Sequence, residues 1–135
     1  MIVTKEDLDT MARTIYGESR GETLLGQQAV AWVIINRARA GGWWGNTIGK
    51  VCRHPFQFSC WNADDPNRKN IEAVGAETPS FIRAIGVAAL CLTDDLKDPT
   101  AGSTHYHTAE VEPAWSKGKT SVAMIGHHHF FNDVA

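Results

Sequence analysis

Apolar and polar residues recur along the first part of the chain with the spacing of helices. Four apolar residues near the start fall at positions i, i+3, i+4 and i+7: Leu8, Met11, Ala12 and Ile15. Thr4 precedes them and suits the N-cap of a helix. Gly17 and Gly21 predict a break after this helix, and Glu18 lies inside the predicted break.

A second helix is predicted from about residue 23 to about residue 39. Its middle, Ala29 to Ile35, is apolar on nearly every side, as in a helix at the centre of a small protein. Gly41 and Gly42 end it. Shorter helices are predicted at residues 47–52, before His54-Pro55, and at residues 68–76 and 80–93.

The last third of the chain has a different pattern. Residues 104–107 and 127–131 are short segments rich in aromatic residues and histidine, which predicts two strands. No repeat, linker or low-complexity stretch separates them from the helices. We therefore expect one α+β domain, mainly α, over residues 1–135, with a small β element.

Composition narrows the classes of partner. The chain has 135 residues, 43% hydrophobic and 21% charged, with a net charge of −2. No basic patch stands out, so nucleic acid is not an expected partner. The longest apolar run, residues 29–35, is too short to span a bilayer. Residues 1–7 lack the pattern of a signal peptide, so we expect synthesis in a cytoplasm without self-export.

The three cysteines do not form the pattern of a secreted disulfide scaffold. Cys52 and Cys60 are close enough in sequence to pair in an oxidising compartment, and the sequence leaves that question open.

Glu18 is the first candidate for chemistry. A carboxylic acid between two buried helices can be partly desolvated, which raises its pKa and keeps it protonated near neutral pH. That is the protonation state a glycosidase acid needs. The alternative is that Glu18 and Glu22 are surface acids, with Glu22 explained by its place near the N-terminus of the next helix.

The segment from Phe56 to Trp61 is the second candidate. Aromatic faces beside the polar side chains of Gln57 and Ser59 suit a sugar-binding groove. The alternative is a core strand in which Phe56 and every second residue face one way and Gln57, Ser59 and Trp61 the other.

His105 and His107 are the third candidate. On a strand they share one face, a spacing that can hold zinc, while Tyr106 points the opposite way. A third ligand could come from residues 127–129, Glu110 or Glu112. The alternative is a pair of structural, hydrogen-bonded histidines.

Together these segments resemble the spore-cortex-lytic and cell wall hydrolases of bacteria and their phages, from Met11 to Phe131. The residues that carry the resemblance are Ala12–Glu22, Gly26–Ala31, Val33–Arg37, Phe56–Cys60, Thr104–His107, Pro113–Trp115 and Ile125–His127. Each piece is modest alone, but their order along the chain is specific.

The resemblance implies a lysozyme-like helical fold and a lytic transglycosylase that cleaves between N-acetylmuramic acid and N-acetylglucosamine. Glu18 would be its acid and base, giving 1,6-anhydro products without a metal or cofactor. By the same likeness, Tyr106 would hydrogen-bond near the reacting sugar. Gln57, Ser59 and Trp61 would line the groove.

The resemblance also bears on how the protein reaches its substrate. The spore enzymes often carry an export signal and a wall-binding module. Because neither is recognised in this sequence, we expect a phage or prophage endolysin. Such an endolysin would be released through a holin-formed lesion and act on the wall as a monomer, without stable insertion in the membrane. Two alternatives remain: a zinc amidase that uses His105 and His107, and a non-catalytic wall-binding module.

Overall fold

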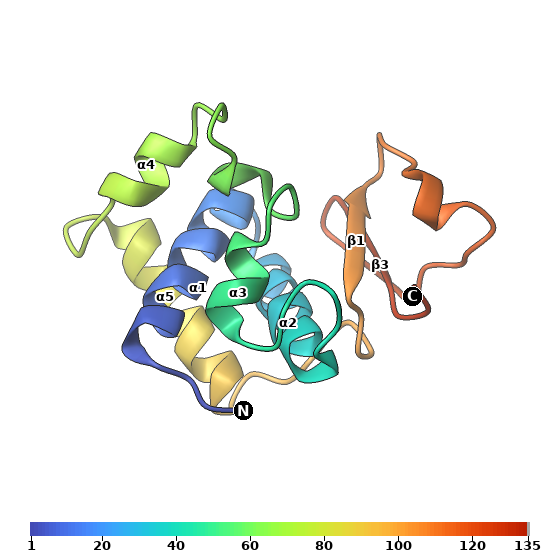
Figure 1. Cartoon of the computed structure of the whole chain (residues 1–135), viewed down its shortest axis with the longest axis horizontal. Coiled ribbons are helices and arrows are strands. Elements are labelled where there is room, and N and C mark those ends of the chain that lie inside the picture. Colours follow the sequence, from blue (N-terminus) through green and yellow to red (C-terminus); the bar gives the residue numbers. More distant parts are fainter. Residues whose placement is uncertain (135) are drawn as a thin grey trace.

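The computed structural model describes residues 1–134, which form a helical body and a small sheet (Figure 1). The α-helices are α1 (Lys5–Ser19), α2 (Leu24–Ala40), α3 (Ile48–Arg53), α4 (Arg68–Ala73) and α5 (Pro79–Leu92). Two 3-10 turns, η1 (Ser59–Trp61) and η2 (Ala114–Ser116), and three strands, β1 (His105–Thr108), β2 (Ala123–Ile125) and β3 (His128–Phe131), complete the chain. The mainly helical α+β architecture is confirmed.

Helix α1 begins where the sequence predicts and ends later. Thr4 and Asp7 form a capping box, in which each side chain accepts from the other residue's backbone N–H. The predicted break at Gly17 is wrong, because α1 runs through it to Ser19. Gly17 serves close packing instead: a Cβ there would lie 2.8 Å from Cys60 Sγ and 2.9 Å from Ile71 Cγ2. Glu18 therefore lies in the last turn of a regular helix.

Helix α2 is the centre of the helical body, as its apolar sequence predicts. Thr23 caps it through the Gly26 N–H, and every residue from Ala29 to Ile35 is buried. Helices α1, α3 and α5 all pack against it, and in Figure 1 it lies between them and the sheet. One face of α2 therefore joins the main core, and another is left for the strands.

The segment from Phe56 to Trp61 is not a strand. Phe56 has φ +64° and is 83% exposed, whereas Phe58 and Cys60 are buried. Residues 59–61 turn as η1, and the Cys60 backbone N–H faces the end of α1. The prediction of an alternating core strand is therefore wrong. The backbone turns at Phe56 and again at η1, so these six residues are not extended.

The strands pair antiparallel in the order β1-β3-β2. Strands β1 and β3 correspond to the two predicted segments, while β2 was not predicted. Tyr106 pairs with Phe130, and His107 pairs with His129. The sheet packs on α2 through a second apolar cluster, formed by Ala29, Val33, Ile125 and Phe130.

Hydrogen bonds from α2 hold the start of β1 in place. The Arg37 Nε–H donates to the Thr104 carbonyl at 2.6 Å, and the Asn36 amide donates to the Ser103 carbonyl at 3.0 Å. Asn36 also donates to Asp98, whose carboxylate accepts from the Thr100 hydroxyl and backbone N–H as well. These bonds fix where Tyr106 stands relative to α1.

Cys52, Cys60 and Cys91 are free and buried. No helix within residues 1–134 combines the length and apolar character that crossing a membrane requires.

Candidate active site

Glu18 lies where three elements meet. Its Oε1 accepts a hydrogen bond from the Tyr106 hydroxyl at 3.2 Å, and its Oε2 accepts from the Cys60 backbone N–H at 3.4 Å. Helix α1 supplies the acid, β1 the phenol and η1 the amide. Residues 42 and 88 positions away in sequence thus converge on one carboxyl group.

Burial raises the pKa of Glu18 above its ordinary value. Hydrogen bonds from Cys60 and Tyr106 oppose the rise, and the negative charge of Asp65 adds to it. The net result favours the neutral acid, as the sequence analysis expected. The same two donors can stabilise the carboxylate once the proton has left, because both point at its oxygens.

Tyr106 stands on the sheet face that looks toward Glu18. Its ring packs edge-on against His128, with centroids 4.9 Å apart, and lies 5.6 Å from the Phe130 ring. Burial raises the pKa of Tyr106 well above its ordinary value, and the neighbouring Glu18 adds to the effect. Tyr106 therefore remains a neutral donor to the acid.

Glu22 is a second, largely buried carboxylate beside Glu18. Its side chain is only 16% exposed, and its oxygens lie 3.3 Å from His128 Nδ1 and 3.6 Å from His127 Nδ1. It directly precedes Thr23, the N-cap of α2, so it lies near that helix's N-terminus as predicted, but its low exposure shows that it is not a surface acid. Burial lowers the pKa of His128 although Glu22 opposes this, so His128 is uncharged at neutral pH.

A surface cavity of about 460 Å³ opens over these groups. It is lined by Glu18, Ser19, Gly21, Glu22, Thr108, Glu110, His127 and His128. The cavity lies at the junction of α1 with the sheet. The acid is thus open to the surface there, with polar groups on both sides.

The groove residues predicted from sequence do not join this cavity. The Trp61 indole N–H donates to Thr14 Oγ1 at 2.9 Å, and its ring lines a separate pocket. Ser59 is exposed at the start of η1, one residue before Cys60, and Gln57 is half-buried in the preceding turn. Of the predicted substrate contacts, Tyr106 alone touches the acid.

His105 and His107 share a face, as predicted, but that face is packed with aromatic rings. The Trp115 ring lies 4.9 Å from His105 and 5.7 Å from His107, and Phe131 stacks on His107 at 5.2 Å. Within residues 1–134, no three His, Cys, Asp or Glu side chains are arranged to hold a metal ion. The third ligand of the zinc amidase alternative is therefore missing from this part of the chain, and the structural reading of the histidines is favoured.

Sequence reasoning missed the contacts that depend on the sheet. His128 faces Glu22 because the register of β3 against β1 places it on the Tyr106 side. The Cys60 N–H faces Glu18 because η1 packs on Gly17. One local sign that these contacts meet at one site is present in the sequence, namely that Glu18 and Glu22 stand in the same motif.

Comparison with known proteins places this chain in a family. The family model described as cell wall hydrolase matches residues 21–131. The spore cortex-lytic enzyme of Halalkalibacterium halodurans is 31% identical over 93% of this chain and 34% of its own length. The spore cortex-lytic enzyme of Bacillus cereus is 30% identical over 94% of this chain and 44% of its own. The chain thus spans between a third and a half of these relatives.

Two solved structures share the fold. The catalytic domain of the germination-specific lytic transglycosylase SleB from Bacillus anthracis superposes with a TM-score of 0.74 at 29% identity, covering 94% of each chain. The catalytic domain of SleB from Bacillus cereus gives a TM-score of 0.76 at 27% identity, covering 96% of this chain and 91% of the other. The predicted lytic-transglycosylase-like fold is confirmed.

Proposed function

Because this chain belongs to the cell wall hydrolase family, we propose that it cleaves peptidoglycan glycan strands as a lytic transglycosylase, with Glu18 as the proton-transferring group. The observation that carries the proposal is the desolvated Glu18 carboxyl with two donors aimed at its oxygens. A buried, protonated acid in a polar cavity is what glycosidic cleavage requires.

In the proposed reaction, neutral Glu18 gives its proton to the oxygen between N-acetylmuramic acid and N-acetylglucosamine. The C–O bond to the muramic acid breaks, and the substrate's acetamido group stabilises the positive anomeric carbon. The C6 hydroxyl of the muramic acid then attacks that carbon and returns its proton to Glu18. The product is a 1,6-anhydro sugar, no water is consumed, and Glu18 ends as it began.

Tyr106 and the Cys60 N–H act on Glu18 within this cycle. Both donate to the carboxylate that forms when the proton leaves, so they stabilise the charged intermediate state of the acid. We also propose that parts of the substrate farther from the cleaved bond contact three other side chains, those of Gln57, Ser59 and Trp61.

Digestion of purified peptidoglycan by wild type and Glu18→Gln, followed by mass spectrometry, tests the proposal. Glu18→Gln keeps the shape of the side chain but removes the transferable proton, so we expect a rate about 100- to 10,000-fold lower. Glu6→Gln is the matched control, because Glu6 is exposed at the far end of α1. Wall binding without any cleavage, by wild type and Glu18→Gln alike, would support the binding-module alternative. Free peptides with intact glycan would support the amidase.

Hydrolysis is the second candidate reaction, because Glu22 supplies a second carboxylate in the same cavity. A hydrolase would need such a group to activate water. Reducing-end products that disappear in Glu22→Gln would establish it. We favour transglycosylation because the Bacillus anthracis catalytic domain that shares the fold at 29% identity is that of a lytic transglycosylase.

The proposal extends to access and assembly. We propose that the protein acts on the wall as a monomer and, in a phage setting, reaches it through a holin-formed lesion. A lysis assay with intact and membrane-permeabilised cells tests access from inside, and light scattering in solution tests the monomer.

A further inference from the structure

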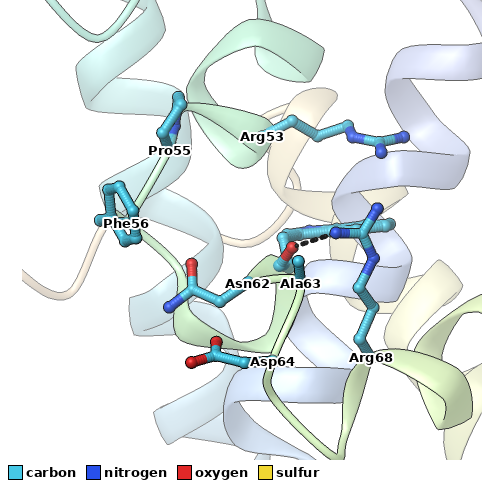
Figure 2. A pocket seen from close by; sticks show the side chains of 8 residues that line it. Arg53, Pro55, Phe56, Asn62, Ala63, Asp64 and Arg68 are labelled. Carbon is cyan, nitrogen blue, oxygen red and sulfur yellow. Dashed lines mark hydrogen bonds between the residues drawn. The ribbon is translucent and has the colours of Figure 1, made fainter.

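A second pocket, of about 440 Å³, lies beside η1 and shares no lining residue with the Glu18 cavity (Figure 2). It is lined by Arg53, Pro55, Phe56, Trp61, Asn62, Ala63, Asp64 and Arg68. The proposed acid–base chemistry uses none of these side chains. The pocket combines two arginines and one aspartate with exposed aromatic surface, a composition that suits a ligand with charged and apolar parts.

One side of the pocket is cationic. The Arg53 guanidinium lies over the Trp61 ring, 4.5 Å from its centroid, and Arg68 donates from Nη1 to the Trp61 carbonyl at 2.9 Å. Figure 2 shows both guanidinium groups on the same side, with Asp64 and Phe56 on the other. Arg68 is partly neutralised by Glu72, 3.7 Å from its Nε, whereas Arg53 is exposed at the end of α3.

The opposite rim is an exposed aromatic surface. Phe56 is 83% exposed, and its φ of +64° is a conformation that bulky residues rarely adopt. Exposing a phenyl ring through a strained backbone lowers stability, so the arrangement calls for a functional explanation. A flat apolar face beside Pro55 and Asn62 suits a ligand that has both apolar and polar parts.

The pocket is connected to the proposed active site through residues that are adjacent in the structure. Trp61 forms part of its wall, and the preceding residue, Cys60, donates its N–H to Glu18. The Trp61 indole is anchored on Thr14, which precedes Glu18 by one turn of α1, a rise of about 6 Å. Two short links, one through Cys60 and one through Thr14, therefore join the wall of this pocket to Glu18.

We propose that this pocket binds the stem peptide of peptidoglycan, with Arg53 and Arg68 engaging a peptide carboxylate. The inference rests on the proposed function. The N-acetylated sugars of the glycan carry no charge, so they offer the two guanidinium groups no partner for an ion pair. The stem peptide begins on the muramic acid at the cleaved bond and carries free carboxylates, whose geometry matches a guanidinium group.

The test compares three substrates made from one preparation of peptidoglycan free of teichoic acid. The first is intact, the second has its stem peptides removed by an amidase, and the third has its peptide carboxylates converted to amides by a carbodiimide and ammonia. The enzymes are wild type, Arg53→Gln and Arg39→Gln. Arg39 is the matched control, because it is also an exposed arginine over a tryptophan ring, 5.3 Å from the Trp32 centroid, and lies outside the pocket.

We expect wild type and Arg39→Gln to prefer the intact substrate over both modified ones. In Arg53→Gln the ratio of kcat/KM for intact over amidated substrate should fall by about fivefold, the size expected for loss of one partly exposed charged contact. Added salt should reduce the wild-type preference in the same direction.

Two results would overturn the inference. One is an Arg53→Gln variant with the wild-type ratio. The other is an Arg53 effect that is absent from these three substrates and appears only in a parallel digestion of wall that retains its teichoic acid, which would assign the pocket to a phosphate. A wild-type enzyme that cleaves none of the three glycans would refute the proposed function instead, so the two failures are distinguishable.

Discussion

Replacing Gly17 by alanine tests why α1 can carry Glu18 into the site. Gly17 lies one residue before the acid, inside the helix, and faces η1 and α4. An added Cβ would stand 2.8 Å from Cys60 Cβ, 2.8 Å from Cys60 Sγ and 2.9 Å from Ile71 Cγ2. All three separations are shorter than carbon atoms tolerate, and Cys60 and Ile71 are fully packed in the core.

Two opposing effects set the magnitude. Alanine in place of glycine inside a helix stabilises by about 0.8–1.0 kcal/mol. Overpacking a well-filled core costs about 1–3 kcal/mol. Because three contacts are violated at once, we expect the steric cost to win, and Gly17→Ala to lower the free energy of unfolding by about 1–2 kcal/mol. Moving η1 away would also weaken the Cys60 N–H bond to Glu18, so activity should fall in the remaining folded protein.

Urea denaturation followed by circular dichroism measures the effect, with Gly86→Ala as the matched control. Gly86 lies in the middle of α5, and a Cβ there would meet nothing within 4 Å. Only the helix-propensity gain applies to it, so Gly86→Ala should stabilise by about 0.5–1 kcal/mol. If Gly17→Ala were stabilised as much as Gly86→Ala, the argument that close packing requires glycine at this position would be refuted.

Two further variants probe the hydrogen bonds of the site and of the loop before β1. Tyr106→Phe removes a donor that lowers the pKa of Glu18, so turnover should fall about tenfold while the alkaline limb of the pH–rate profile moves to higher pH. An unmoved limb would show that Tyr106 does not act on the acid. Burial alone would raise the pKa of Asp98, but hydrogen bonds from Thr100, Asn36 and Gly102 outweigh this and lower it. Because Asp98 is only partly buried and solvent screens its charge, Asp98→Asn should destabilise by roughly 1 kcal/mol at neutral pH. Because a lowered carboxyl pKa stabilises fully above the unfolded value of about 4, the difference should begin to shrink below about pH 4 and vanish only below the lower, folded pKa. A constant difference in urea titrations over that range would contradict it.

The sequence by itself determined the helices, and it also pointed to Glu18 as the candidate acid. The apolar periodicity of α1 and the all-round apolar middle of α2 are local signals, so their positions could be predicted to within a residue or two. The alternation of β1 correctly separated Tyr106 from the two histidines. The motif around Glu18 carried enough information to single out that residue before any contact was known.

Tertiary structure decided everything that depends on residues far apart in the chain. Gly17 has the sequence signature of a helix break, yet the close approach of η1 makes it a packing position inside α1. Glu22 has the signature of a surface acid, yet the register of β3 buries it beside His128. Trp61 has the signature of a groove residue beside the acid, yet its anchor on Thr14 turns it into a different pocket. Periodicity reports which face of an element is buried, but the partner on that face is set by packing between elements.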